Sequence, residues 1–192
     1  MTICIGIDLG GTKIAGAAVD LDNGKVLSQQ VIPTAAHLGT AAVLGRVVSV
    51  VNDVLHKSNL SCEDVAGLGI GVPGAIDPER GYTKFLPNLP SGWRDIPIVS
   101  EVGRMSGLST WLINDARAFT LAEAHLGAGR DAQTVIGITL GTGIGGGIVV
   151  KGHLHEGIAM SAGEIGHMTL DPNGPPCSCG SYGCFETFAS GT

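Results

Sequence analysis

A short hydrophobic segment occurs twice in this chain of 192 residues, and the repeat constrains the fold more than any other feature. The two copies, Ile5-Gly-Ile-Asp-Leu-Gly10 and Ile136-Gly-Ile-Thr-Leu-Gly141, are identical at five of six positions. Each copy has the pattern of a β-strand, leads into a glycine-rich turn and continues into a second apolar segment. We therefore expect two β-hairpins at equivalent places in a duplicated fold.

The segments after the first copy predict further strands and a helix. Asn23-Gly24 is a turn signal of type I′, and Lys25 to Ile32 would continue the sheet. A helix is expected from Ala41 to His56, because apolar side chains recur there on one face, and a buried strand is expected from Val65 to Val72. The residues of the helix face are Val43, Val47, Val51, Val54 and Leu55.

A second strand–helix pair is expected before the second copy. Thr110 to Ile113 is short and apolar, and a helix would run from Ala116 to about Leu126 with Asp115 as its N-cap. This order predicts an α/β fold with mixed sheets flanked by helices. We place the domain boundary between residues 114 and 115, giving domains 1–114 and 115–192.

The bulk composition excludes several classes of protein. A net charge of −6 opposes a broad nucleic-acid or membrane surface, which needs clustered Lys and Arg. The uncharged stretch from Ala132 to Val150 is long enough for a membrane span, but six glycines between Gly137 and Gly147 favour two short strands. Trp111, Phe119, Cys4 and Cys62 are interpreted as packing residues.

One imidazole and three thiols, His167, Cys177, Cys179 and Cys184, lie in a short segment rich in Gly and Pro. Four N and S ligands form a closed tetrahedral site, so we expect a structural Zn²⁺. The alternatives are a disulfide with a spare thiol, or buried cysteines that only pack. No secretory signal follows Met1 and the count of five cysteines is odd, which favours reduced thiols in the cytoplasm.

The first glycine turn, Asp8-Leu-Gly-Gly-Thr-Lys13, has the groups of a phosphate and Mg²⁺ binder. Its glycines let backbone N–H groups reach phosphate oxygens, while Asp8 can hold the metal through its water shell. The alternative is an ordinary hairpin turn.

The second turn, Leu140-Gly-Thr-Gly-Ile-Gly-Gly-Gly147, also matches a dinucleotide-binding fingerprint. That fingerprint must open a helix, whereas here the glycines run into Ile148-Val-Val150, a strand pattern. Two such hairpins suit a nucleoside triphosphate better. In phosphoryl transfer one carboxylate accepts the proton of the attacking hydroxyl, and Asp115 is the candidate, with a plain N-cap as the alternative.

The motifs taken together resemble the ROK family of sugar kinases and repressors, within the actin-like ATPase superfamily with its ribonuclease H-like fold. The resemblance runs from Ile5 to Gly191. It rests on the blocks Asp8–Lys13, Gly71-Val-Pro-Gly74, Asn114-Asp115, Gly141–Gly147, Gly163-Glu-Ile-Gly-His167 and Cys177–Cys184, which occur in the family's order.

The resemblance implies an ATP-dependent sugar kinase with Asp115 as catalytic base. Phosphates of ATP would contact the two glycine turns, through Gly10, Gly11, Thr12, Lys13, Gly141, Thr142 and Gly143, with Asp8 serving Mg²⁺. The hexose would be held by Asn88, Asn114, Asp115, Glu164, His167 and Glu186. His167 would then use one ring nitrogen for zinc and the other for the sugar.

The resemblance also bears on specificity, completeness and assembly. Asn88-Leu-Pro-Ser-Gly-Trp93 looks like the glucokinase version of the sugar loop, which favours glucose; N-acetylmannosamine and other hexoses remain alternatives. Family kinases continue beyond Thr192, so we expect an incomplete second domain and weak or absent ATP turnover by this chain. Family members are often homodimers.

Two other kinds of function remain open. Family repressors sense sugars, but they carry a helix-turn-helix ahead of the first hairpin, and Asp8 follows Met1 too closely for one. A non-catalytic sugar-binding module is the other alternative. Sugar binding without nucleotide binding would indicate such a module.

Overall fold

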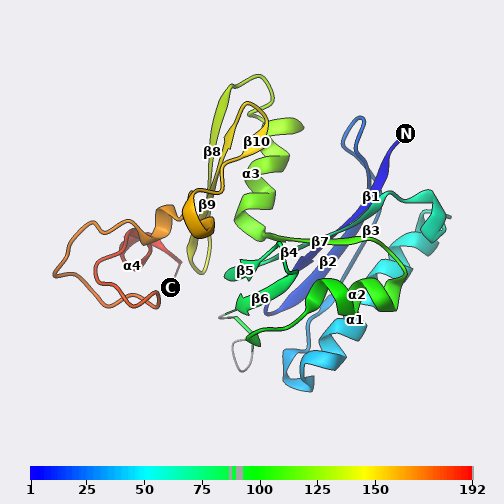
Figure 1. Ribbon diagram of the computed structural model, residues 1–192, viewed down its shortest axis with the longest axis horizontal. Coiled ribbons are helices and arrows are strands. Elements are labelled where there is room, and N and C mark those ends of the chain that lie inside the picture. Colours follow the sequence, from blue (N-terminus) through cyan, green and yellow to red (C-terminus); the bar gives the residue numbers. More distant parts are fainter. Residues whose placement is uncertain (87, 90–92, 192) are drawn as a thin grey trace. The chain divides into compact units, whose positions relative to one another are not determined.

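The computed structural model describes residues 1–86, 88–89 and 93–191 (Figure 1). The chain divides into two compact units, Met1–Asp115 and Ala116–Thr192. Both contain strands and helices, so the α/β prediction is confirmed. Of the expected sugar loop, Pro90, Ser91 and Gly92 lie outside the described residues.

A five-stranded mixed sheet forms the centre of the first unit, with the order β3-β2-β1-β4-β7. β1 and β2 form the predicted hairpin, and β3 continues it antiparallel, whereas β4 and β7 run parallel to β1. The carboxyl ends of β1, β4 and β7 therefore lie along the same edge of the sheet. The strands are β1 (Ile3–Leu9), β2 (Lys13–Asp20), β3 (Lys25–Pro33), β4 (Gly67–Val72) and β7 (Thr110–Asn114).

Helices α1 (Thr40–Lys57) and α2 (Ile98–Ser106) complete the core of this unit (Figure 1). The helix predicted from the apolar stripe is confirmed and extends one residue further at each end. All five residues of the predicted face are buried, together with apolar residues of β1 and β4 such as Ile5 and Ile70. Smaller elements connect these parts: η1 (Ala36–Leu38), η2 (Cys62–Asp64), β5 (Ala75–Asp77) and β6 (Tyr82–Phe85).

The second unit is built on the repeated hairpin. β8 (Thr134–Leu140) and β9 (Ile144–Val150) are antiparallel, and β10 (His153–Leu154) adds to β9. The glycines of the second turn thus run into a strand, as predicted, and not into the helix that a dinucleotide fingerprint requires. α3 (Asp115–His125) leads into this unit, and η4 (Ile158–Met160), η5 (Ile165–His167) and α4 (Phe185–Ala189) follow the hairpin.

Three side chains interpreted as packing residues are exposed. Trp111 is 60% exposed because it alternates with buried Leu112 on β7 and lies over Gly67, on the face opposite Leu112. Phe119 is 44% exposed because α3 turns Ala116 and Thr120 towards the glycines of the hairpin, leaving Phe119 on another side. Cys62 is exposed as well.

Two local predictions also need correction. The loop between β2 and β3 is a four-residue turn, Leu21 to Gly24, in which only Gly24 has a positive φ, so it is not of type I′. Asp115 is the first residue of α3, and not the residue before it.

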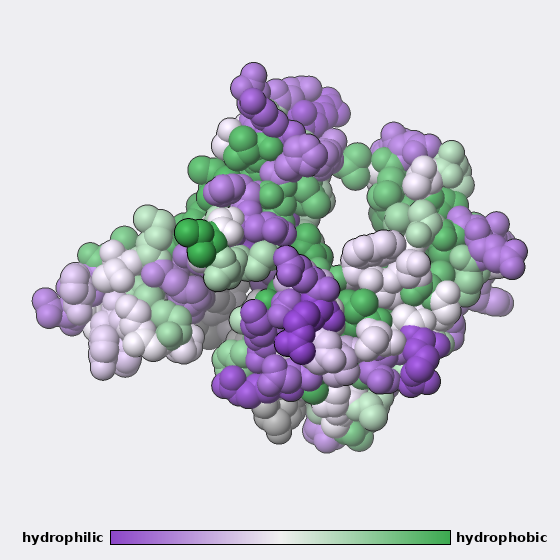
Figure 2. Space-filling model, viewed as in Figure 1, coloured by the Kyte–Doolittle hydropathy of each residue, from purple (hydrophilic) through white to green (hydrophobic). Residues whose placement is uncertain are grey.

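In the part of the chain that the structure describes, no helix has the length and apolarity to cross a membrane. Polar residues cover much of the face seen in Figure 2.

Candidate active site and metal centre

Two carboxylates, Asp8 and Asp115, lie on either side of Gly71 at the carboxyl edge of the first sheet. Asp8 pairs with Gly71 across β1 and β4. A Cβ placed on Gly71 would lie 3.7 Å from the Cα of Asp115. Burial raises the pKa of Asp8, the negative charge of Asp115 raises it further, and Lys13 opposes both effects. The two carboxylates are therefore close enough to interact electrostatically.

Asn114 connects the end of β7 to the predicted Gly71–Gly74 block. It pairs with Val72 in the sheet, and its Nδ2 donates a hydrogen bond to the carbonyl oxygen of Gly74 at 3.3 Å. Three blocks that are distant in sequence are thus brought to one edge of the sheet. Open α/β sheets bind ligands beyond this edge.

The first glycine turn is held by hydrogen bonds at both of its ends. The Gly10 N–H donates to the carbonyl oxygen of Lys13 at 3.0 Å. The buried hydroxyl of Thr34 donates to the carbonyl oxygen of Gly10 at 2.6 Å, and the Thr34 N–H donates to Thr12 at 2.8 Å. The turn is therefore rigidly supported. Thr34 carries this support, and nothing in the local pattern of the sequence singled it out.

Asn88 lies directly against this turn. A side chain on Gly11 would collide with the backbone carbonyl of Asn88, so only glycine permits the approach. Next to Asn88, Leu89 is 3% exposed and anchors the segment in the core. Gly11, which is expected at the phosphates, and Asn88, which is expected at the sugar, are thus in close contact within the first unit.

The second glycine turn is closed by groups from the end of the chain. The Gly141 N–H donates to Gly143 at 2.9 Å, and the Gly191 N–H donates to the carbonyl oxygen of Gly141 at 2.8 Å. Glu186 accepts a hydrogen bond from the Ile144 N–H at 2.8 Å. A Cβ on Gly143 would collide with this carboxylate. A predicted sugar ligand and a predicted phosphate turn are therefore in contact.

Glu164 forms an ion pair with Arg117, a buried residue of α3. Arg117 donates from Nη2 to Glu164 Oε1 at 3.1 Å and also to the carbonyl oxygens of Met160 and Ala162. Arg117 is 3% exposed, whereas the side chain of Glu164 is 48% exposed. The sequence analysis did not identify Arg117. The signal available in the sequence was a charged residue next to Ala116, on the side of α3 that is buried.

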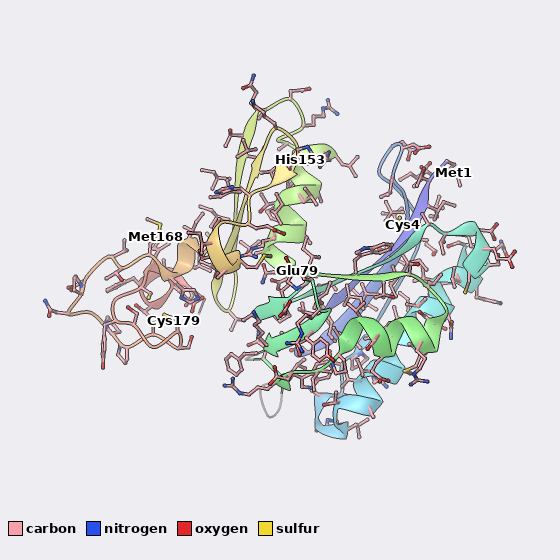
Figure 3. All side chains as sticks on the ribbon, in the orientation of Figure 1. Met1, Cys4, Glu79, His153, Met168 and Cys179 are labelled. Carbon is pink, nitrogen blue, oxygen red and sulfur yellow. The ribbon has the colours of Figure 1, made fainter. Side chains whose placement is uncertain are left out.

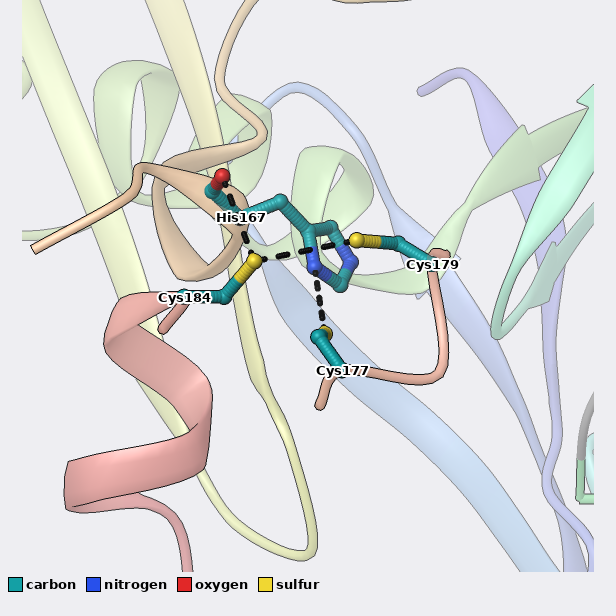
Figure 4. A group of neighbouring side chains, drawn as sticks. All are labelled: His167, Cys177, Cys179 and Cys184. Atoms are coloured by element: carbon teal, nitrogen blue, oxygen red, sulfur yellow. Dashed lines mark hydrogen bonds between the residues drawn. The ribbon is translucent and has the colours of Figure 1, made fainter. Parts of the chain in front are cut away.

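The donor atoms of His167, Cys177, Cys179 and Cys184 all lie within 4.8 Å of one another (Figure 4). The Sγ of Cys177 is 3.6 Å from Nδ1 of His167, and the Sγ atoms of Cys179 and Cys184 are 3.7 Å apart. All five cysteines are free thiols, which does not fit the disulfide alternative. Cys4, labelled in Figure 3, and Cys62 belong to the first unit and not to this cluster.

The thiols of the cluster differ in acidity. Burial raises the pKa of Cys184 to about 12, and the neighbouring thiols Cys177 and Cys179 raise it as well. Burial also raises the pKa of Cys177, but hydrogen bonds from Cys179, His167 and Cys184 outweigh it and lower the pKa to about 7.

The cluster fits a tetrahedral metal ion. Ligands at about 2.0–2.3 Å from a tetrahedral zinc lie about 3.3–3.8 Å apart, which matches the sulfur–sulfur and sulfur–nitrogen distances above. One imidazole and three thiols form a donor set that zinc prefers, and all four positions are supplied by protein. These residues could therefore hold one Zn²⁺ with no open position.

Comparison with known proteins identifies the family. The family model described as "ROK family" matches residues 4–192, so the chain belongs to the ROK family. Glucokinase from Thermotoga maritima is 40% identical over 188 residues, which cover 98% of this chain and 57% of that protein. The chain thus spans little more than half the length of this relative.

Solved structures agree with the sequence comparison. The ROK hexokinase from Thermus thermophilus has a TM-score of 0.87 at 37% identity, covering 99% of this chain and 61% of that one. The Streptomyces griseus ROK glucokinase, solved with glucose and AMPPNP, has a TM-score of 0.84 at 37% identity, covering 98% of this chain and 57% of that one.

Two further relatives by sequence are each 35% identical to this chain. They are an N-acetylmannosamine kinase from Vibrio vulnificus, of which the chain covers 61%, and the xylose repressor of Bacillus subtilis, of which it covers 47%.

Proposed function

We propose that the protein is an ATP-dependent hexokinase that transfers the γ-phosphoryl group to a hexose hydroxyl, with glucose as substrate and glucose 6-phosphate as product. The observation that carries this proposal is the pair Asp8 and Asp115 beside Gly71, at the carboxyl edge of the sheet. Its neighbours there are a rigid glycine turn and Asn88. Membership of the ROK family and the glucokinase relatives support the same reaction.

Asp115 would act as the general base. Its carboxylate would accept the proton of the attacking sugar hydroxyl while the hydroxyl oxygen forms the new bond to the γ-phosphorus and ADP leaves. Asp8 would hold the water shell of Mg²⁺, which neutralises charge on the phosphates when bound. Gly10, Gly11, Thr12 and Lys13 would supply donors to the phosphates.

The family resemblance supports the remaining proposed contacts to phosphate and sugar. Gly141, Thr142 and Gly143 are the proposed phosphate contacts of the second unit. The proposed sugar ligands, which would donate to and accept from the sugar hydroxyls, are Asn88, Asn114, Glu164, His167 and Glu186. Zinc at His167, Cys177, Cys179 and Cys184 would fix His167 through Nδ1, so that the other ring nitrogen stays available to the sugar.

Two alternatives are each favoured by one comparison. An N-acetylmannosamine kinase is among the matching relatives, so an acetamido sugar is the second candidate substrate. A xylose repressor also matches, which favours a sugar-binding regulator that does not turn over ATP. We further propose a cytoplasmic homodimer, on the strength of the family resemblance.

A coupled ADP-release assay over a panel of hexoses tests the proposed function. It is run on residues 1–192 and on any longer form from the same gene, with glucose, mannose, N-acetylmannosamine and xylose. Glucose-dependent ADP release with a preference over the other sugars supports the proposal. Calorimetry on the longer form separates the alternatives, because binding of sugar without any binding of ATP–Mg²⁺ would indicate the regulator and contradict the kinase.

A further inference from the structure

We propose that Arg117 is a positioning residue that holds the carboxylate of Glu164, and the loop that precedes it, in the geometry needed to bind the sugar. The inference rests on the proposed function, since it takes Glu164 as a sugar ligand. Arg117 itself would not touch the sugar.

The charge of Arg117 is buried and forms an ion pair with Glu164. Arginine is almost never fully buried unless it is paired, because desolvation of the charge is costly. Arg117 is 3% exposed and lies between two buried neighbours of α3, Ala116 and Thr120. Such a position favours a specific role for the guanidinium group over a general contribution to the surface.

Three acceptors of Arg117 Nη2 lie in one short segment, residues 160–164. Nη2 donates to the carbonyl oxygens of Met160 and Ala162 and to Oε1 of Glu164. One end of the guanidinium group thus gathers two carbonyl oxygens of the loop and the carboxylate of Glu164 through charge-assisted hydrogen bonds. The side chain therefore ties the loop and the carboxylate to α3 together.

The loop before Glu164 needs such support because its backbone is unusual. Ala159 and Met160 have φ values of 54° and 62°, in the left-handed region that non-glycine residues rarely adopt. Gly157 and Gly163 also have positive φ, at 67° and 86°. Residues held in this region persist when the surrounding contacts determine them, and they cluster at ligand sites.

Glu164 is held on one side and open on the other. Its Oε1 is bound to a buried guanidinium group, yet the side chain as a whole is 48% exposed. A carboxylate that is already held by Arg117 loses little conformational freedom when a sugar hydroxyl binds to it. Preorganisation of this kind increases affinity by lowering the entropic cost of binding.

A double-mutant cycle on glucose binding tests the proposal. The variants Arg117→Met, Glu164→Gln and the double variant are titrated with glucose by calorimetry, next to the wild-type chain. We expect Arg117→Met to raise the Kd for glucose about tenfold or more, the scale of one charge-assisted hydrogen bond. In the Glu164→Gln background the same change should raise the Kd less than about twofold, because Arg117 then has no carboxylate to position.

Controls separate positioning from a general loss of stability. Arg46→Met removes another arginine that binds a backbone carbonyl, that of Pro33, and should leave the Kd unchanged. Arg117→Lys keeps the charge and should recover part of the affinity. If Arg117→Met does not fold, as judged by circular dichroism, the cycle is run with Arg117→Lys.

Each outcome has a distinct meaning. Equal effects of the Arg117 change with and without Glu164 would overturn the positioning role and indicate a structural one. A wild-type Kd in Arg117→Met would overturn it as well. If the wild-type chain binds no glucose while it is folded, the proposed function fails and this inference fails with it.

Discussion

Glu186 accepts a hydrogen bond from the backbone N–H of Ile144 at 2.8 Å, so the first turn of α4 is bonded to the end of the second glycine turn. The carboxylate occupies the space that a side chain at Gly143 would need. This contact joins a residue proposed for the sugar to a turn proposed for ATP. The contact also predicts that Gly141 tolerates a side chain better than Gly143 does.

We expect Gly143→Ala to lower the stability of the protein by about 0.5–1.5 kcal/mol, because the new methyl group would displace the Glu186 carboxylate and break its hydrogen bond to the Ile144 N–H. The control is Gly141→Ala, whose Cβ would meet nothing within 4 Å and whose φ is not in the strained region. Thermal denaturation measures both variants. Equal losses of stability in the two would contradict the importance of the Glu186 contact.

Asp115→Asn should reduce kcat by about 10²–10⁴, because the amide cannot accept the proton of the sugar hydroxyl. The KM for ATP should change little, since the residue is proposed to act on the sugar. Steady-state kinetics on a form of the protein with ATP turnover measure both constants. Glu79→Gln, a change at an exposed carboxylate of the same unit, serves as the control. A kcat within a few-fold of wild type would remove Asp115 from the mechanism.

The purified protein should contain one zinc per chain by elemental analysis. Cys184→Ser should abolish the metal content, because this thiol is fully buried in the cluster. If the metal contributes about 3 kcal/mol, chelation would lower the Tm by about 6–12 °C. Cys62→Ser should retain both zinc and Tm, as this exposed thiol lies outside the cluster. Full stability after verified removal of zinc would argue against a structural metal.

The raised pKa of Asp8 predicts that this carboxylate destabilises the fold when it is ionised. The penalty is absent below the ordinary value of 3.8, where Asp8 is protonated in both folded and unfolded states. It develops as the pH rises through the higher pKa of the folded protein. Asp8→Asn should therefore have a higher Tm than wild type at about pH 7, and the two curves should converge near pH 3. Asp131→Asn is the control, because this carboxylate is almost fully exposed. A lower Tm for Asp8→Asn at neutral pH would contradict the assigned cause.

Local patterns in the sequence were enough to predict the hairpins, the long helix and the grouping of His167 with three cysteines. The two hairpins follow from a repeated alternation of apolar residues, and α1 follows from valines at helical spacing, since both depend on periodicity within one element. His167 and the cysteines could be grouped because they lie within 18 residues and share one chemistry.

The features that were missed depend on contacts between elements. Arg117 and Glu164 are 47 positions apart, and neither residue by itself indicates the other. Trp111 was expected to be buried because it is large and apolar, yet its exposure depends on the face of β7 that it occupies. The support of the first turn by Thr34 likewise requires the sheet to bring β3 beside β2. Such information is three-dimensional and does not appear as a spacing.

Cys184 directly precedes α4, and Glu186 is the second residue of that helix. Cys184 and Glu186, the acceptor of the hydrogen bond from the Ile144 N–H, are therefore only two positions apart. Oxidation of Cys179 and Cys184 to a disulfide, from two thiols whose Sγ atoms are 3.7 Å apart, would pull on the residues next to Glu186. Handling the protein under reducing conditions would then protect its second glycine turn as well as its sulfur atoms.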